Sequence, residues 1–195
     1  MRTQNAGGRI FLLILAAVIT SSITASAART YRVDPVHSMA LFSAKRFNVS
    51  QIHGRFNAIS GTIVTDQDDI EKSSVEIEIK TESVDTGNGR RDTHLRSPDF
   101  FNVKQFPVMK FKSTQVKKTG ENSFEITGDM TIHGVTKSVT ATAELIGSSE
   151  GGRGGSLIGF ETTFTLKRSD FGMNFMTGGI GDEIKITLAI QGLGQ

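Results

Sequence analysis

Apolar and polar residues alternate with a period of two through most of the chain after residue 30, and this limits the possible folds more than any other feature. In the segment 75–80, for example, Val75, Ile77 and Ile79 alternate with Glu and Lys. Successive side chains of a strand point to opposite faces, so such a segment is predicted to be an antiparallel strand with one buried face. The same alternation, or a shorter form of it, occurs at 39–45, 56–65, 109–116, 124–126, 129–133, 139–145, 160–166 and 184–190.

These segments predict an all-β fold of about eight to ten strands, without the strand–helix–strand pattern that builds a parallel sheet. Closing the sheet into an antiparallel barrel of about eight strands, or slightly more, leaves no sheet edge open and leaves room inside for a ligand. One or two short helices are expected beside the barrel. One is predicted to begin at Ser97-Pro98-Asp99, where Ser suits a helix cap and Pro the first helical position, and another is predicted over 47–52.

The first 27 residues have the pattern of a cleaved signal peptide. Arg2 and Arg9 precede an unbroken apolar run from Ile10 to Ile19, and Ala25-Ser26-Ala27 provides the small residues that signal peptidase requires. The apolar run is well short of the ~20 residues of a membrane-spanning helix. We therefore expect a signal peptide over 1–27, cleavage after about Ala27, and one exported domain over 28–195 with no stable insertion in a membrane.

Charge and cysteine content narrow the partners of that domain. Removing Arg2 and Arg9 leaves 20 basic and 20 acidic residues, without a dense basic run, so we expect no binding to nucleic acid. The chain has no cysteine, which excludes disulfides and a lipidated N-terminal Cys. The exported domain is therefore expected to be free in solution.

The aromatic content is one-sided, with thirteen Phe, one Tyr and no Trp, beside six Met. Phe and Met side chains carry no strong polar group and adapt to the shape of a long hydrocarbon chain. These residues are either the packed core of the barrel or the wall of a lipid-binding interior. The predicted apolar lining consists of Phe42, Phe56, Phe100, Phe101, Met109, Phe111, Met130, Phe164, Phe171 and Phe175.

The histidines and serines do not form a recognised catalytic or metal-binding motif. His37, His53, His94 and His133 are widely spaced, although folding could bring some of them to a carboxylate. His37-Ser38, and His94 near Asp92, contain the residue types of a nucleophile and a base, but no Gly-x-Ser-x-Gly elbow surrounds a serine. We expect no catalytic residue, no metal site and no cofactor other than a bound lipid.

The densest polar cluster is the segment 87–94, Gly-Asn-Gly-Arg-Arg-Asp-Thr-His. Arg90, Arg91 and His94 could bind a phosphate, because guanidinium groups make paired hydrogen bonds to phosphoryl oxygens. A surface role in ion pairs is the alternative. The segment lacks the Lys-Ser/Thr ending of a nucleotide-binding P-loop.

The order of motifs resembles the YceI-like family of polyisoprenoid-binding proteins. The resemblance covers about residues 31–191 and depends on Val33–Ser38, Ser83–Asn88 with Arg91–Phe101, Phe106–Ser113, Gly128–Lys137 and Lys167–Met173. It implies an exported, periplasmic, lipocalin-like barrel that encloses a long isoprenoid or similar lipid, with the head group near the mouth and without a reaction.

We take as head-group candidates the basic residues expected near the mouth: His37, Arg46, Arg90, Arg91, His94 and Arg168. Arg46 departs from the family, whose members often have His at this position after Lys. If Arg46 faces the mouth it would favour a phosphate or carboxylate head, and the alternative is a solvated outward side chain.

The leading hypothesis is therefore a periplasmic transport protein for a long-chain amphiphilic lipid such as a polyprenyl compound. One alternative is an enzyme that acts on a lipid or quinone through His37 or His94. The other is a stress-related interaction protein whose Phe residues are only core. A homodimer through edge strands, and a lid formed by the loop Gly151–Gly155, stay open.

Overall fold

The computed structural model describes residues 28–151 and 155–195, so the predicted signal peptide and the centre of the Gly151–Gly155 loop lie outside the described residues. The described part contains eleven strands, one α-helix and three short 3-10 helices. The strands are β1 (Arg29–Val33), β2 (Met39–Arg46), β3 (Ser50–Phe56), β4 (Ile59–Thr65), β5 (Ser74–Lys80), β6 (Val84–Asp85), β7 (Val108–Lys118), β8 (Ser123–Ile132), β9 (Val135–Ser149), β10 (Leu157–Lys167) and β11 (Ile180–Gly194), and the helices are η1 (Ile70–Lys72), η2 (Thr81–Ser83), α1 (Gly89–Arg96) and η3 (Arg168–Phe171).

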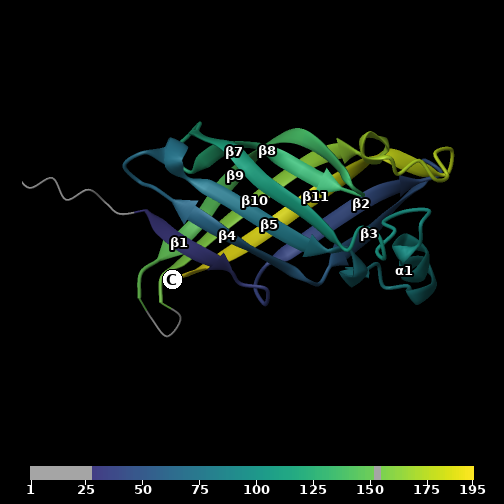
Figure 1. Cartoon of the computed structure of the whole chain (residues 1–195), viewed down its shortest axis with the longest axis horizontal. Coiled ribbons are helices and arrows are strands. Elements are labelled where there is room, and N and C mark those ends of the chain that lie inside the picture. Colours follow the sequence, from purple (N-terminus) through teal and green to yellow (C-terminus); the bar gives the residue numbers. More distant parts are fainter. Residues whose placement is uncertain (1–27, 152–154) are drawn as a thin grey trace, which may run out of the picture.

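The strands form a closed antiparallel barrel (Figure 1). β1 and β2 both pair with β11. On their other edges, β1 pairs with β4 and β2 pairs with β3. β5 and β6 continue the order, because β5 pairs with β4 and β6 pairs with β3. These six short strands thus form three interrupted long ones, which with β7 to β11 give eight positions around the barrel. The predicted eight-stranded all-β barrel is confirmed.

The interruption between β1 and β2 is held by polar groups of its own residues. The Asp34 carboxylate accepts a hydrogen bond from the Val36 N–H at 2.9 Å and lies 2.7 Å from Nδ1 of His37. The Asp34 N–H donates to the Gln191 carbonyl at 2.8 Å, and the Gln191 N–H donates to the Ser38 hydroxyl at 3.0 Å. β11 therefore continues unbroken beside a strand that bends at Pro35.

Both sequence-predicted helix positions are wrong, although the number of α-helices, one, agrees with the prediction. The helix α1 begins after Asn88, whose side chain accepts a hydrogen bond from the Arg91 N–H at 3.0 Å, and it ends at Arg96, with Ser97 as its C-cap. Ser97 has ψ of 171°, because the following Pro98 disfavours helical backbone at the residue before it. The Ser-Pro signal therefore ends a helix here.

The segment 47–52 is a hairpin turn followed by the first residues of β3. Phe47 and Asn48 have φ of 48° and 56°, and the Val49 N–H donates to the Arg46 carbonyl at 3.1 Å. Two consecutive left-handed residues are the geometry of a type I′ turn, whose twist matches that of the flanking strands. Asn48 tolerates this backbone, whereas Phe47 is an uncommon choice for it.

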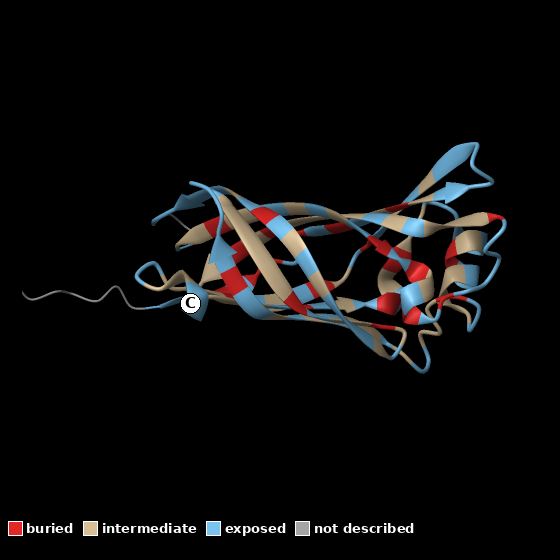
Figure 2. Cartoon of the chain, turned by 90° about the horizontal axis from the view of Figure 1, so that it is seen from above, coloured by how far each residue is buried: buried red, intermediate tan, exposed pale blue. Residues whose placement is uncertain are grey.

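Two apolar clusters stabilise the barrel. One includes Tyr31, Val33 and Val84, and the other, near η3, contains Ile132, Leu166, Phe171 and Met173. Figure 2 shows buried residues both along the strands and in the segments that contain α1. Several inward side chains, however, are only half-buried, which indicates that the interior is not filled.

Candidate functional site

The end of the barrel that carries α1 opens into a cavity of about 610 Å³. Its wall comes mainly from β2, β3, α1 and β11, with further residues from β5, β7, β8, β10 and η3 and from the loops that follow α1 and η3. Phe42, Phe56 and Phe101 form an aromatic group on this wall, with ring centroids 5.5 Å and 5.4 Å apart. This space is referred to below as the first cavity.

A second cavity of about 280 Å³ lies farther along the barrel. Its wall includes Phe111, Phe124, Met130, Phe160 and Phe164. The two cavities share a group of apolar side chains, so they adjoin inside the barrel and together form a long apolar space. The shared residues are Ile79, Met109, Ile132, Ile186 and Leu188.

Small residues at inward positions keep this space open. Ala40 and Ala44 line the first cavity, and Ala141 and Ala143 line the second. At Gly54 an added Cβ would collide with the ring of Phe42, so glycine is required for that ring to lie across the neighbouring strand. Interiors are normally packed as densely as organic crystals. Small residues beside large aromatic ones on the cavity walls therefore indicate space for a bound molecule.

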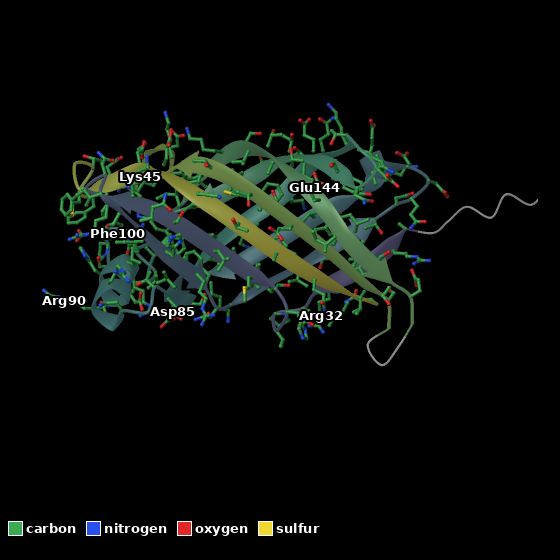
Figure 3. All side chains as sticks on the ribbon, turned by 180° about the vertical axis from the view of Figure 1, so that it is seen from behind. Arg32, Lys45, Asp85, Arg90, Phe100 and Glu144 are labelled. Atoms are coloured by element: carbon green, nitrogen blue, oxygen red, sulfur yellow. The ribbon has the colours of Figure 1, made fainter. Side chains whose placement is uncertain are left out.

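The mouth of the first cavity is positively charged. Among the described residues, five Lys and Arg side chains and no Asp or Glu belong to its wall. Lys45, Arg90 and Phe100 lie at the same end of the barrel, with Arg90 on α1 (Figure 3). The second cavity has the mixed set Arg29, Asp66, Lys110 and Glu150 among its lining residues. An anionic group would therefore be favoured at the mouth and not at the opposite end.

The helix α1 is fixed at the mouth by its own charged side chains. Arg91 donates to the hydroxyl and the carbonyl of Thr86 at 2.7 Å and 2.8 Å, and the buried Asp92 accepts hydrogen bonds from the hydroxyl and N–H of the same residue. Arg96 donates to the carbonyls of Glu82 and Val84, both at 2.8 Å. These contacts leave Arg90 as the exposed guanidinium of the helix, beside the cavity opening.

His94 joins α1 to two loops. Its Nε2 lies 2.8 Å from a carboxylate oxygen of Asp99, and its ring makes edge contacts with Phe100 and Phe175 at centroid distances of 5.0 Å and 5.2 Å. An imidazole held in this way presents polar and apolar surface together at the mouth.

Arg168 is the buried cation of the first cavity, with 3% of its surface exposed. Its guanidinium donates to the carbonyls of Met173, Ile180 and Gly181 at 2.7 Å, 3.0 Å and 3.0 Å. Burial lowers the pKa of Arg168, and the nearby Asp182 opposes that effect. Arg168 thus fixes the loop between η3 and β11 and adds positive charge to the cavity wall.

Most residues predicted from the sequence lie on the cavity walls. The first cavity includes Phe42, Phe56, Phe100, Phe101, Met109, Arg46, Arg90, Arg91, His94 and Arg168, and the second includes Met109, Phe111, Met130 and Phe164.

Three predicted residues lie outside both walls. Phe171 is 2% exposed and packs in the cluster near η3, and Phe175 is on the outer rim against His94. His37 is an exposed residue of the β1–β2 interruption.

The residues considered for catalysis have structural partners. Ser38 bonds to the backbone of Gln191, and Asp34 bonds to Val36 and His37, whose hydrogen bond lowers the pKa of Asp34. No group of three His, Asp or Glu side chains within the described ranges could hold a metal ion.

Sequence reasoning missed the aliphatic part of the lining. Ile52, Ile180, Ile184 and Met173 line the first cavity, and Val139 lines the second. Inward positions of β9, β10 and β11 were visible in the alternation of apolar residues. A list of Phe and Met residues left out the isoleucines and the valine, and it also omitted Met173.

A closed antiparallel barrel with a long apolar interior and a cationic mouth defines a barrel of the ligand-enclosing class. Residues 31–192 match the YceI-like domain, and the chain belongs to this family, as the sequence motifs predicted. A UPF0312 protein of Pseudomonas aeruginosa is 39% identical over 170 residues, which cover 86% of this chain and 88% of the relative.

Solved structures share the fold. The YceI protein of Campylobacter jejuni is 32% identical with a TM-score of 0.69, over 75% of this chain and 86% of that one. A polyisoprenoid-binding domain from Saccharophagus degradans has a TM-score of 0.67 at 15% identity, over 85% of this chain and 98% of that one, which establishes similarity of fold alone. Within residues 28–151 and 155–195, no helix has the length and apolar character needed to cross a bilayer.

Proposed function

We propose that this protein binds one long-chain amphiphilic lipid of the polyisoprenoid class and carries it through the periplasm. The observation that carries the proposal is the pair of adjoining apolar cavities opening at a mouth lined by Arg and Lys and by no carboxylate among the described residues. The name of the Saccharophagus degradans domain, polyisoprenoid-binding, supports the same ligand class.

The size of the interior suits a long chain. A carbon group of a lipid tail takes about 30 Å³, similar to a water molecule in the liquid. Cavities of about 610 Å³ and 280 Å³ therefore hold roughly 20 and roughly 9 carbons. At ~0.3 kcal/mol per carbon, such a ligand would bind with a free energy of about 9 kcal/mol, or a Kd of a few tenths of a micromolar. The apolar tail supplies most of this affinity.

The mouth is the proposed position of the head group. Arg46, Arg90 and Arg91 line the opening from β2 and α1, and Arg168 lies in the wall. A phosphate or carboxylate there would gain charge-assisted hydrogen bonds without facing a lining carboxylate. A head group that stays partly solvated adds less affinity than the tail and instead fixes the direction in which the lipid enters.

We infer binding without chemical transformation. Asp34, His37 and Ser38 lie outside both cavities, and His94 is paired with Asp99. Export to the periplasm rests on the signal-peptide pattern of residues 1–27, and the absence of cysteine in the sequence is consistent with an unanchored carrier.

The proposal is tested by native mass spectrometry of the protein purified from the periplasm of its own cells. We expect a one-to-one complex whose extra mass is a long-chain lipid that organic extraction releases. Leu188→Gln places an amide in the wall shared by the cavities and should lower occupancy at least fivefold, because burying an unpaired amide costs about 1–3 kcal/mol.

Lys185→Gln is the matched control, because Lys185 lies on the same strand but is exposed and outside both cavities. Protein that carries no lipid, yields none on extraction and takes up no prenyl lipid in vitro would refute the proposal. Turnover of a lipid that is lost in His37→Ala or His94→Ala would instead favour an enzyme.

A further inference from the structure

Four exposed apolar side chains gather at the mouth of the first cavity. Phe47 is 47% exposed, Val49 82%, Phe175 39% and Met176 44%. They come from the β2–β3 turn and from the loop between η3 and β11, two segments at the α1 end of the barrel in Figures 1 and 3. These four residues are referred to below as the mouth rim.

Contacts between the two segments hold the mouth rim together. The Phe47 N–H donates to the Gly179 carbonyl at 2.8 Å. A Cβ added at Gly179 would lie 2.6 Å from Cε of Met176 and 2.9 Å from the ring of Phe47, so both side chains lie against this glycine. Phe175 packs on the rings of His94 and Phe100, at 5.2 Å and 5.4 Å. The rim is thus a built surface that extends from β2 to α1.

Two rim residues have backbone angles that are unfavourable for large side chains. Phe47 has φ of 48° and Met176 φ of 54°. Left-handed backbone costs about 1–2 kcal/mol at a residue with a Cβ, and Gly or Asn would avoid most of that cost. Strain of this kind persists mainly where the side chain serves a function. Exposed Phe and Met at such positions are therefore evidence that their apolar surface is used.

Cations surround the rim. Arg46 lies over the ring of Phe47, with its guanidinium carbon 4.6 Å from the ring centroid, and Lys45 and Arg90 are exposed beside the same opening. Two carboxylates in the adjoining segments are engaged: Asp99 with His94, and Asp182 with the hydroxyl and N–H of Ser169. Positive charge is therefore free to face an external anionic surface.

We propose that the mouth rim docks the barrel on the surface of an anionic lipid bilayer. Phe47, Val49, Phe175 and Met176 enter the interface between head groups and acyl chains, while Lys45, Arg46 and Arg90 contact lipid phosphates. Apolar side chains flanked by cations are the combination that partitions into such an interface. The rim borders the cavity opening, so docking places that opening against the bilayer from which a lipid would enter. The proposal goes beyond lipid binding, because it names the surface on which exchange takes place.

The test is flotation of the chain 28–195, which contains every strand of the barrel, with vesicles of phosphatidylglycerol and phosphatidylcholine or of phosphatidylcholine alone. We expect binding to the anionic vesicles that weakens with salt. Phe47→Asn with Val49→Ser and Met176→Asn removes three of the four apolar side chains of the mouth rim, and Asn suits the left-handed backbone. This variant should bind at least tenfold more weakly. Val36→Ser with Ile146→Ser, two exposed apolar residues outside the rim, is the matched control.

A second pair of variants tests the cations. Arg46→Gln with Arg90→Gln should weaken binding to anionic vesicles roughly 25-fold, from about fivefold per cation. Arg32→Gln with Lys137→Gln removes the same charge from other strands and should leave binding within twofold.

Equal binding of the rim variant and its control, or no binding to anionic vesicles by the unmodified chain, would overturn membrane docking. Capture by a protein partner through the rim, without vesicle binding, would overturn it also. Native mass spectrometry of the same variants separates the two proposals, because a rim variant that keeps its lipid but not its vesicle binding has lost only the docking surface.

Discussion

Replacing Ala141 by Leu adds three carbons to the wall of the second cavity, where Ala141 is only half-buried. At about 30 Å³ per carbon, the substitution fills roughly a third of a cavity of about 280 Å³. A ligand whose tail reaches this space loses about three buried carbons. At ~0.8 kcal/mol per CH₂ that loss is about 2.4 kcal/mol, or a roughly 50-fold rise in Kd.

The effect should depend on chain length. Lipids of up to about 20 carbons fit the first cavity alone and should bind Ala141→Leu as they bind the unmodified protein. Longer homologues should show the full loss. The measurement is isothermal titration calorimetry with a prenol series, after delipidation. Ala189→Leu, the same change at a position of β11 outside both cavities, is the control. Equal losses for short and long chains would refute the idea of one continuous channel.

Three further predictions concern stability. Arg168→Met should lower the free energy of unfolding in urea by at least about 3 kcal/mol, because three backbone carbonyls lose their donor, and a loss under 1 kcal/mol would contradict this role. Asp34→Asn should destabilise the protein at pH 7, and the difference should shrink as the pH falls below the ordinary carboxyl pKa. The lowered pKa of Asp34 makes its contribution present above the ordinary carboxyl pKa and lost as pH falls through the folded-state value, so a difference that does not shrink with falling pH would be inconsistent. Phe47→Asn should raise the thermal unfolding midpoint, since Asn relieves about 1 kcal/mol of left-handed strain, and a lower midpoint would exclude that strain.

The strands were the predictable part of the fold, because alternation is a local property. Val75, Ile77 and Ile79 show their common face without reference to any other strand. Closure into a barrel was also accessible from the need to pair every edge. The interruptions at 34–38 and 57–58 could not be predicted from the sequence. They depend on how the long strands β1–β2 and β3–β4 pair with each other and with their outer neighbours.

The helix was misplaced because a Ser-Pro pair has two meanings. Ser97 was interpreted as a cap that starts a helix, whereas Pro98 forces it out of helical backbone and ends one. The actual start signal, Asn88, lay in a segment interpreted mainly for its Arg and His residues. Asn is a favoured N-cap residue, so Asn88 was a start signal that the sequence did contain.

The candidate site, too, was predictable only in part. Arg90, Arg91 and His94 are neighbours in the sequence and were grouped from it, but only the topology brings Arg46 and Arg168 to the same opening. Composition could not separate Phe164, which lines a cavity, from Phe171, which is packed core. That distinction depends on the space left after all eight strand positions are occupied.

Closure of the barrel joins the two ends of the described chain. Tyr31 of β1 pairs with Gly194 of β11, and the Gln195 N–H donates to the Thr30 carbonyl at 3.0 Å. β11 is therefore needed before β1 has both its neighbours, and the barrel cannot close until β11 has been synthesised. Such long-range pairing slows folding. A barrel that stays open until β11 has been made would also suit the export of an unfolded chain, which we propose from the signal-peptide pattern.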